Sequence, residues 1–422
     1  MTLISFPIYN GVMNKGRKII TFVVVVAAAS GLLVTSCGQR ATPNSTAPIT
    51  IKVGLPTPLT DPEAPWGQAN VEPYLAWVDL FNQTGFEVAG KTYQFQIVMA
   101  DDHDSQEGGT TAAQQLVYQD GCRFLAGHWS WSYDAISAIT NPAKVIFVTR
   151  TGAGIHYDPK TQPYNVFGSA SKEAWVADVL ATHEAFPDRK IGLLEPTSGL
   201  TPAEIAEINR QSFDPAGMNY EWEVYPADTT DFTPYFTKLT EDGCNLVYSD
   251  AGFSTTTALL KQRWDAGYDW PLGQGGGLAP IEDYVAACGY QATQGLIGSY
   301  FGIWDFKETK VDPKYITMCQ QVMKALSQKH GGDYTYNDWI GWLPSHLLIL
   351  SQAMEKAGTV DDPDAIMAAI RGGTFDSTGG TCPMSGQKTY GSPVVFGNPG
   401  AICIVQGSQA VYLAEHPVDS IP

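Results

Sequence analysis

The sequence predicts an α/β protein with two lobes, each a doubly wound parallel β-sheet covered by helices. Strand-like and helix-like segments alternate along most of the chain, which is typical of right-handed β-α-β units. The clearest unit is 111–153, where apolar residues at helical spacing precede two short apolar runs, 123–126 and 145–148. The stretch from residue 49 onward is longer than one hydrophobic core usually serves, so it indicates two lobes.

The first set of elements begins at residue 49. An apolar run there is typical of a strand, and the next segment places Tyr74, Leu75, Val78 and Phe81 on one helical face. A second strand ends in acidic residues, and the unit described above follows it. We expect a strand at 49–56, a helix at 72–84, a strand at 93–102, and a helix, strand, helix and strand within 111–153.

Two loops of the 111–153 unit are candidates for a binding site. The motif GHWSWS at 127–132 follows one strand, and TRTGAG at 149–154 follows the next. In open parallel sheets, ligands bind outside the carboxyl ends of the strands. Both loops are therefore predicted to point into one cleft, where they offer hydroxyl groups and aromatic rings to a ligand.

A second set of alternating elements begins near residue 174. Thr201 and Pro202 form an N-cap and a first-position proline, which predicts the start of a helix. Pro344 is expected in a kink or in the first turn of a later helix. The expected elements are helices at 174–186, 201–217, 315–329 and 335–358, strands at 189–196, 220–226 and 401–406, a helix and a strand within each of 232–252 and 255–277, and a turn-rich segment at 372–400.

The N-terminal residues are typical of an export signal. Met13 begins a positively charged stretch, an apolar run covers 19–34, and small residues follow. A membrane helix is the alternative, although the run is short for one and no positive flank follows it. The residues 33–37, LVTSC, resemble a bacterial lipobox, in which the cysteine, here Cys37, becomes the lipidated N-terminus. A simple cleaved signal is the alternative to lipidation.

Residues 1–36 are therefore predicted to be a removable lipoprotein signal peptide. The segment 37–48 is polar and rich in Pro, Ser and Thr, so it cannot bury enough apolar surface to fold. We expect it to be a flexible tether between the membrane and the folded part of the protein.

The chain is acidic, with 25 Lys and Arg against 43 Asp and Glu and a formal net charge of −18. The predicted signal removes Lys15, Arg17 and Lys18 and no acid, so the exported chain is more acidic still. This charge repels nucleic acids and anionic lipids, which argues against a role in binding either of them. An acidic surface that keeps an exported protein soluble is a sufficient explanation.

Cysteine usage fits an oxidising compartment. Of seven cysteines, six remain if Cys37 is lipidated, and their pairing is open. We expect a disulfide between Cys382 and Cys403, because both lie in the glycine-rich C-terminal segment, where a crosslink would stabilise most. Cys122 and Cys244 each follow an Asp-Gly at the start of a strand and are expected to be buried thiols.

The order of motifs along the chain resembles one known family. VGLPTPLT at 53–60, ADDHDSQEGGTTAAQQLV at 100–117, GHWSWS, VIFVTRTGA at 145–153 and DFTPYFTKLTEDGCNLVYSDAG at 231–252 are similar to the periplasmic binding proteins for branched-chain amino acids. The similarity covers nearly all of the chain after the tether. It implies a type I periplasmic binding fold, whose two lobes close on a ligand, in the receptor of an ABC importer.

The resemblance also implies that the chain crosses between the lobes three times. The crossings are expected near 167–169, 300–302 and 397–401. Lobe 1 would combine residues 49–167 with 302–397, and lobe 2 would combine 168–301 with 398–422.

In similar proteins, loops of the first lobe hold the ligand carboxylate. Strand-end loops and helix N-termini supply the charge-assisted donors that a carboxylate needs. Each matching residue has an alternative as an ordinary turn, capping or packing residue. The first-lobe candidates implied by the resemblance are Trp66, Trp131, Ser132, Thr151, Gly152 and Ala153.

The second lobe departs from the family pattern, in which an acid holds the ligand ammonium. The run LGQGGG at 272–277 has no acid where the family places one, with Gln274 as its polar residue, and Gly199 stands where the family has a tyrosine. Asp250, after the strand LVY, is the nearest replacement and is otherwise a solvent-facing helix cap. An ammonium buried without an acid is costly. Either Asp250 takes that part, or the ligand lacks an ammonium.

These observations predict a monomeric, lipid-anchored solute receptor that serves the permease subunits of an ABC importer. The ligand class is a small carboxylate-bearing solute: a branched-chain or other amino acid, or an amino acid-like or aromatic acid. Micromolar binding requires about 8 kcal/mol, more than two or three hydrogen bonds of about 1 kcal/mol supply. Closure of the lobes must therefore also bury the apolar part of the ligand. No cofactor is expected.

An enzyme and a sensor are the alternatives. The sequence contains no GxSxG elbow, HExxH, P-loop or strand-following GxGxxG motif. The acidic residues around His103, at 101–107, are a weak metal candidate because their spacing fits neither a helical site nor an EF-hand. A sensor lipoprotein that feeds a signalling receptor would differ in its partner and not in its fold.

Overall fold

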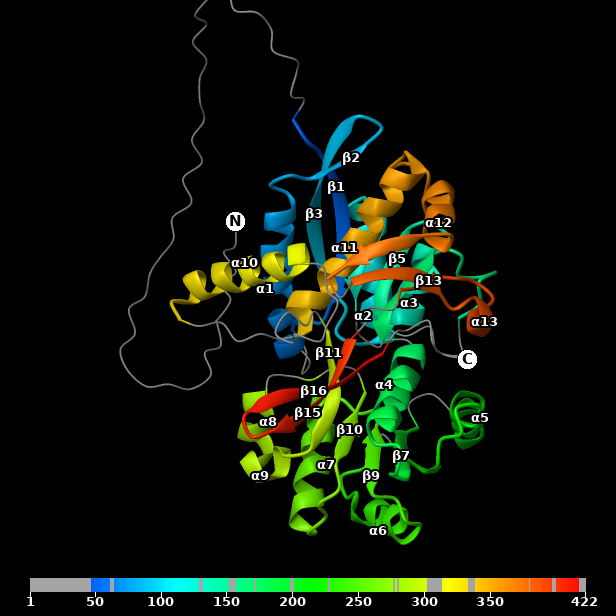
Figure 1. Cartoon of the computed structure of the whole chain (residues 1–422). Coiled ribbons are helices and arrows are strands. Elements are labelled where there is room, and N and C mark those ends of the chain that lie inside the picture. The colour runs from blue at the N-terminus through cyan, green and yellow to red at the C-terminus, as the bar shows by residue number, and fades with distance from the viewer. Residues whose placement is uncertain are drawn as a thin grey trace, which may run out of the picture. The chain divides into compact units, whose positions relative to one another are not determined.

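Two β-sheets organise the chain (Figure 1). The computed structural model describes residues 47–60, 64–128, 132–151, 157–170, 172–197, 201–226, 228–275, 278, 281–301, 313–332, 338–378, 380–396 and 400–416. Helices and strands alternate through these residues, and most neighbouring strands are parallel. The predicted α/β class is confirmed.

The first sheet has nine described strands in the order β12-β13-β14-β6-β5-β4-β1-β3-β2. Its centre is parallel, and the hairpins at its two edges are antiparallel. The centre is buried because β1, β4 and β5 are rich in Val, Ile, Leu and Phe. The strands are β1 (Ile49–Thr57), β2 (Phe86–Val88), β3 (Lys91–Asp101), β4 (Phe124–His128), β5 (Ile146–Thr151), β6 (Asn165–Ala170), β12 (Thr374–Ser377), β13 (Gly380–Ser385) and β14 (Val395–Phe396).

Helices from both halves of the sequence pack on this sheet. Trp77 of α1 joins Cys319, Val322 and Leu326 of α10 and Leu348 of α11 in one buried cluster, so these three helices form a layer. The helices are α1 (Ala64–Phe81), α2 (Gln106–Gln114) with a π-helical turn η1 (Gln115–Gln119), α3 (Tyr133–Thr140), α10 (Pro313–His330), α11 (Asp338–Ala357), α12 (Pro363–Arg371) and α13 (Gln387–Tyr390).

The second sheet has seven described strands in the order β16-β15-β11-β10-β9-β7-β8. Its two faces bury separate clusters, one under α4 and α5 and the other under α6, α7 and α8. The elements are β7 (Ile191–Pro196), β8 (Tyr220–Tyr225), β9 (Leu246–Ser249), β10 (Leu272–Gln274), β11 (Leu296–Phe301), β15 (Gly400–Gln406), β16 (Gln409–His416), α4 (Lys172–Ala185), α5 (Pro202–Phe213), α6 (Thr233–Glu241), α7 (Phe253–Asp265), α8 (Ile281–Cys288) and α9 (Tyr290–Thr293).

Local sequence signals predicted the start of α5 correctly and the start of α1 wrongly. Thr201 caps α5 in a capping box with Glu204, and Pro202 is its first residue, as predicted. The α1 helix begins at Ala64 and runs through Pro73, whereas the sequence predicted a start at residue 72, next to that proline. Pro344 lies inside α11 and not in its first turn. A proline inside a helix removes one backbone hydrogen bond, which the packing of α1 and α11 outweighs.

The predicted disulfide between Cys382 and Cys403 is not present. Cys403 carries a thiol and is buried in the core of the second sheet. Its Sγ donates a hydrogen bond of 3.9 Å to the Ala401 carbonyl oxygen. Cys382 stands on β13, a strand of the first sheet. The two residues share a turn-rich stretch of sequence, but the chain passes from one sheet to the other between them. Cys122 and Cys244 are buried free thiols, as predicted.

The apolar N-terminal run, the predicted signal that contains it and Cys37 lie outside the described residues. None of the helices in the part of the chain that the structure describes combines the length and apolarity needed to cross a bilayer.

Candidate functional site

The carboxyl ends of β3, β4 and β5 bring polar residues together at one edge of the first sheet. These strands run parallel, through their shared pairing with β1 and with one another, so they end at the same edge. Asp102 follows β3, His128 ends β4, and Thr149 lies near the end of β5. Ser132 is the N-cap residue of α3, the helix that follows β4.

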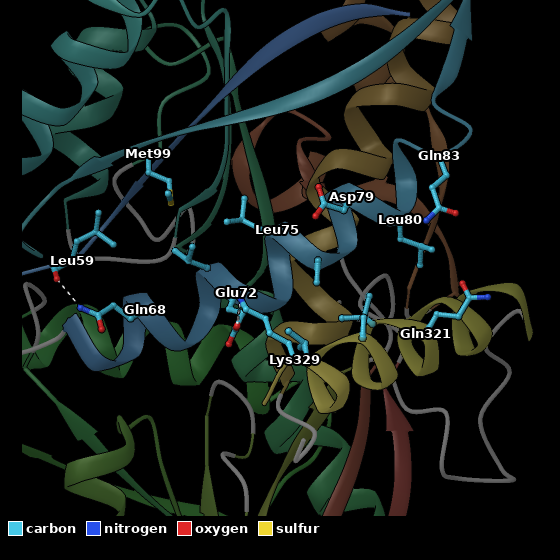
Figure 2. A pocket seen from close by; sticks show the side chains of 15 residues that line it. Leu59, Gln68, Glu72, Leu75, Asp79, Leu80, Gln83, Met99, Gln321 and Lys329 are labelled. Carbon is cyan, nitrogen blue, oxygen red and sulfur yellow. Dashed lines mark hydrogen bonds and ion pairs between the residues drawn. The ribbon is translucent and has the colours of Figure 1, made fainter. Parts of the chain in front are cut away.

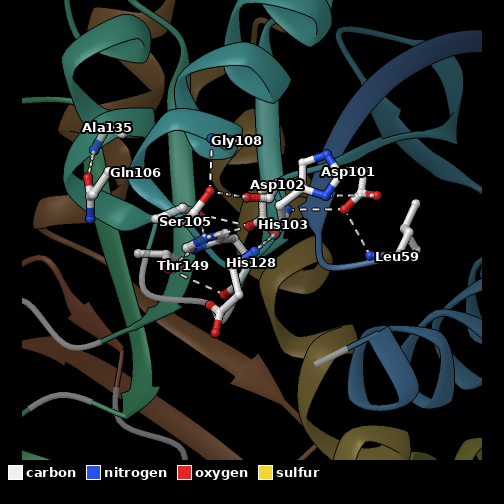
Figure 3. A network of polar contacts seen from close by, with 12 residues as sticks. Leu59, Asp101, Asp102, His103, Ser105, Gln106, Gly108, His128, Ala135 and Thr149 are labelled. Carbon is white, nitrogen blue, oxygen red and sulfur yellow. Dashed lines mark hydrogen bonds and ion pairs between the residues drawn. The ribbon is translucent and has the colours of Figure 1, made fainter. Parts of the chain in front are cut away.

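A fully buried hydrogen-bond network joins these four side chains (Figure 3). Ser132 Oγ donates to Asp102 Oδ2 over 2.8 Å and lies 2.8 Å from His128 Nε2. The other ring nitrogen of His128, Nδ1, lies 3.0 Å from Thr149 Oγ1. His128 Nε2 is also 3.4 Å from Asp102 Oδ2. The network therefore connects the ends of three strands to the start of α3.

The network contains the residue types of a nucleophilic triad without its geometry. In a triad, the acid holds the histidine and the serine gives its proton to the free ring nitrogen. Here Ser132 donates to Asp102, and Thr149 contacts His128 Nδ1. All four side chains have zero exposed area, so a substrate would not reach them. The arrangement can support the neighbouring loops, and it does not present an activated hydroxyl group.

The side chain of Ser132, a predicted ligand contact, is buried and engaged with Asp102 and His128. Contact between Ser132 and a ligand stays a prediction. Gly109 of α2 packs directly on Ser132, because a Cβ at Gly109 would lie 2.4 Å from Ser132 Cβ.

The remaining first-lobe candidates are described only in part. Thr151 ends β5, where it pairs with Ala170 of β6, and Trp66 lies in the first turn of α1. The side chains of Trp66 and Thr151 lie outside the described part of the structure. Trp131, Gly152 and Ala153, and Gly199 of the second lobe, lie outside the described residues.

The acidic loop after β3 ties together two strand ends. Asp101 Oδ1 accepts hydrogen bonds from the backbone of Leu59 (3.0 Å) and His103 (3.1 Å), and Thr60 donates to its other oxygen. His103 and Asp104 adopt positive φ angles of 49° and 45° in this tight turn. No group of three or more His, Cys, Asp or Glu among the described residues could hold a metal ion.

The second sheet places the two other predicted residues at the ends of neighbouring strands. Asp250 follows β9 and is exposed. Gln274 ends β10 and is 3% exposed, with its Oε1 accepting a hydrogen bond of 2.8 Å from the Tyr284 hydroxyl. Its backbone carbonyl accepts another, also of 2.8 Å, from Tyr248. Gln274 is therefore held in the sheet edge, while Asp250 is open to solvent.

One acid at this edge was not predicted from the sequence. Glu195 of β7 is 8% exposed and accepts a hydrogen bond of 2.6 Å from Asn209 Nδ2. Burial raises the pKa of this carboxyl group to about 8. The negative charge of Asp250 also raises this pKa, whereas the hydrogen bond from Asn209 lowers it. The available signal was an acid directly after the apolar run IGLL, at the carboxyl end of a strand.

A separate groove of about 650 Å³ runs along α1 and α10 (Figure 2). Its walls are mainly aliphatic, and an ion pair of 2.6 Å between Glu72 and Lys329 links the two helices. None of the predicted site residues is among the residues that line it.

Comparisons with known proteins agree with this architecture. A family model described as periplasmic binding protein matches residues 50–393. The leucine-, isoleucine-, valine-, threonine-, and alanine-binding protein of Pseudomonas aeruginosa is 24% identical over 337 residues, which are 78% of this chain and 84% of that protein.

Two solved structures illustrate the likeness in fold. The branched-chain amino acid transporter substrate binding protein LivJ of Streptococcus pneumoniae, in complex with isoleucine, has a TM-score of 0.67 and 16% identity, covering 87% of this chain and 99% of that one. A solute binding protein of an ABC transporter from Rhodopseudomonas palustris, in complex with 3,4-dihydroxy benzoic acid, has a TM-score of 0.66 and 17% identity, covering 88% and 99%.

Proposed function

The chain belongs to the periplasmic binding protein family, and from that premise we propose that it is the solute receptor of an ABC importer. It has the type I periplasmic binding fold. In this proposal, two lobes close by hinge motion on a small carboxylate-bearing solute and deliver it to the permease subunits. The protein itself carries out no reaction on the solute.

The observation that carries the proposal is the way in which two chain segments build each sheet. Strands from 49–170 and 374–396 form the first sheet, and strands from 191–301 and 400–416 form the second. This supports a division into lobe 1 (49–167 and 302–397) and lobe 2 (168–301 and 398–422), with three crossings that can act as a hinge.

The carboxylate of the solute would bind at the edge of the first sheet. The N-terminus of α3 and the carboxyl ends of β4 and β5 lie there, and helix N-termini and loop amides are suitable donors for an anion. The Asp102–His128–Ser132–Thr149 network supports this part by fixing the strand ends from beneath. The candidate contacts of the first lobe are Trp66, Trp131, Ser132, Thr151, Gly152 and Ala153.

The ligand class remains an amino acid or an aromatic acid. The relative from P. aeruginosa is named for five aliphatic or hydroxylic amino acids, and the two solved neighbours hold isoleucine and 3,4-dihydroxy benzoic acid. All of these solutes carry a carboxylate beside an apolar or weakly polar body. The shared carboxylate supports the proposed class.

The proposed setting is the outer side of a bacterial cytoplasmic membrane. The signal at 1–36, the lipobox cysteine Cys37 and the polar tether at 37–48 support export and lipid anchoring of a monomer. The family match supports an extracytoplasmic location.

A thermal-shift screen of the processed protein tests the proposal. The probes are L-leucine, L-isoleucine, L-valine, L-phenylalanine, benzoate and 3,4-dihydroxybenzoate, with glucose as a control solute. A probe at 100 times its dissociation constant adds about 2.7 kcal/mol to the free energy of unfolding, which raises Tm measurably. Stabilisation by at least one carboxylate and not by glucose is expected. If no carboxylate raises Tm, the proposed ligand class is wrong.

A further inference from the structure

The buried network at the edge of the first sheet contains a histidine, the side chain that gains or loses a proton in the physiological pH range. Its members are Asp102, His128, Ser132 and Thr149, and none of them has exposed area (Figure 3). Buried polar groups depend on protein partners for their hydrogen bonds. The arrangement of protons among these side chains therefore determines which charge states of His128 the site can hold.

One ring nitrogen of His128, Nε2, carries a proton in either charge state. Ser132 Oγ has one proton and donates it to Asp102 Oδ2 over 2.8 Å. The contact of 2.8 Å between Ser132 Oγ and His128 Nε2 therefore uses the proton of the ring nitrogen. Asp102 Oδ2 lies 3.4 Å from the same nitrogen and favours this arrangement by its negative charge.

The other ring nitrogen, Nδ1, can act as an acceptor or as a donor at the same atomic positions. Thr149 Oγ1 lies 3.0 Å from Nδ1 and 3.3 Å from the backbone carbonyl oxygen of His128. When the ring is neutral, Thr149 donates to Nδ1. When the ring is charged, Nδ1 donates to Thr149 Oγ1, which turns its own proton to the carbonyl oxygen. Both charge states of His128 are thus fully hydrogen-bonded.

The surroundings of His128 act on its charge in opposite directions. The carboxylate of Asp102 favours the charged ring. Complete burial favours the neutral ring, and so does the positive end of the α3 dipole, where Ser132 is the N-cap residue. The acids of α2 and α3, Glu107 and Asp134, are exposed, so solvent screens them. Because the buried effects oppose each other, a further charge at this edge can shift the proton state.

The groups that face His128 from β5 and α11 add no described charge in contact with its ring. On β5, the uncharged ring of Phe147 packs against it with 5.3 Å between the ring centroids. On α11, His346 is the titratable neighbour, and its Nδ1 accepts a hydrogen bond of 3.0 Å from the Gly127 backbone. The side chain of Arg150, also on β5, lies outside the described part of the structure.

We infer that His128 makes the receptor selective for carboxylates over neutral ligands, because it takes up a proton when a carboxylate binds at this edge. This role rests on the proposed function, which places the ligand carboxylate there. The negative charge of the ligand favours the charged ring. The proton comes from the solvent and is held on Nδ1, while Thr149 turns its own proton to the backbone. The two new charges compensate each other, whereas a neutral ligand brings no charge and causes no uptake.

This coupling fixes the direction in which affinity changes with pH. A complex that holds more protons than its separate partners forms more readily at low pH. Uptake of one proton raises the dissociation constant of a carboxylate by up to about tenfold per pH unit, wherever the empty receptor has a neutral His128 ring. The contribution of His128 to the binding of a neutral ligand does not change with pH.

Calorimetric titration of the processed protein tests the inference with matched probes. L-leucine is compared with L-leucinol, L-phenylalanine with L-phenylalaninol, and benzoate with benzamide, so that each pair differs in the carboxylate. Titrations at pH 6, 7 and 8 in phosphate and in ACES count the protons exchanged, since the two buffers differ in ionisation enthalpy. Wild-type protein should take up close to one proton with a carboxylate in part of this range, and none with the neutral partner.

The variant His128→Gln tests the assignment, because its amide keeps a donor for Ser132 and cannot take up a proton. We expect it to lose the carboxylate-linked uptake, to bind the carboxylate at least tenfold more weakly at pH 6, and to bind the neutral partner unchanged. Titrating groups elsewhere contribute equally to both proteins and cancel in the difference between them.

His103→Gln is the matched control. His103 lies in the turn after β3, its side chain is 53% exposed, and its Nδ1 is 3.4 Å from Asp101 Oδ2. This variant should retain the affinity and the proton uptake of the wild type. The proton counts of the wild type are independent of whether a variant folds.

Each outcome decides the inference. Carboxylate binding without proton uptake at all three pH values overturns it, and so does uptake that persists in His128→Gln or disappears in His103→Gln. Binding of the neutral probes alone, or with the same uptake as the carboxylates, overturns it while leaving the receptor function intact. If none of the probes binds, both the inference and the proposed function are wrong.

Discussion

At the scale of single residues, two adjacent glycines allow α2 to lie against the polar network. A Cβ on Gly108 would lie 2.1 Å from the Asp102 carbonyl oxygen, and a Cβ on Gly109 would lie 2.4 Å from Ser132 Cβ. Both distances are far below van der Waals contact, so a larger residue would displace Asp102 or Ser132. The glycines therefore set the distance between α2 and the strand ends.

Replacing Gly109 by alanine should destabilise the protein by about 1–3 kcal/mol, because overpacking shifts Ser132 away from Asp102 and His128. Urea unfolding measures the loss. Gly332→Ala is the control, since a Cβ there meets no atom within 4 Å. The close packing of α2 on Ser132 would be refuted if Gly109→Ala were as stable as Gly332→Ala.

Glu195 should make the stability of the protein fall as the pH rises. The folded state holds a proton on this carboxyl up to a pKa of about 8, whereas the unfolded chain loses it near the ordinary pKa of 4.5. Between these values the folded state binds more protons, so the free energy of unfolding decreases by about 1.4 kcal/mol per pH unit from this group.

Glu195→Gln removes that contribution. Urea unfolding at pH 5, 6, 7 and 8 should therefore show the wild type losing stability relative to the variant as the pH rises. Other titrating groups are common to both proteins and cancel in the difference. Parallel stability curves would mean that Glu195 ionises in the folded state as it does in the unfolded chain.

At the scale of elements, the buried Arg263 caps the C-terminal end of α9, a helix that lies beside the second sheet. Arg263 of α7 is 3% exposed and donates to the carbonyl oxygens of Trp270 (3.0 Å), Ala292 (2.7 Å) and Gln294 (2.6 Å). Burial lowers the pKa of its guanidinium to about 10, so it is still charged at neutral pH. It supplies donors that the last carbonyls of α9 lack.

Arg263→Leu should cost about 3–5 kcal/mol, because three carbonyl oxygens lose a charged donor. The comparison is Lys261→Met on the same helix, which removes an exposed ion pair with Asp265 and should cost under about 1 kcal/mol. Chemical denaturation measures both. Equal losses in the two variants would contradict the capping role of Arg263.

The sequence predicted the central elements better than the peripheral ones. Buried strands such as β1, β4 and β7 are apolar runs, and α5 has a capping signal, so local sequence was sufficient for them. The two-residue strand β14 and the strand β16 were not predicted. β14 pairs with the distant β6, so it leaves no local pattern. β16 pairs with β15, which directly precedes it, across a turn between Gln406 and Gln409.

Prediction of the site was limited for a similar reason. That β4 and β5 end at the same edge could be predicted from strand order, because neighbouring parallel strands share that edge. That Ser132 is buried, and that Glu195 is buried beside Asp250, depends on packing against α2, α5 and β9, which the sequence does not show locally. A lone acid after a strand has the same sequence pattern whether it faces solvent or the core.

At the scale of the whole molecule, the proposed hinge closure has a measurable outcome. A solute that the thermal-shift screen identifies should lower the radius of gyration of the processed protein in small-angle X-ray scattering, because closure brings the lobes together. Far-UV circular dichroism should stay unchanged, since the sheets move as bodies. A non-stabilising solute from the same screen is the control. Binding with an unchanged radius of gyration would argue against closure.

The order in which the strands occur along the chain also affects how the protein is made. Phe167 of β6 pairs with Val395 of β14, and β11 pairs with β15, so the last strands of the sequence complete both sheets. During synthesis, β6 and β11 are unpaired edge strands until their partners β14 and β15 have been made. Unpaired edge strands promote aggregation. A chain truncated before residue 395 would therefore leave both edges exposed.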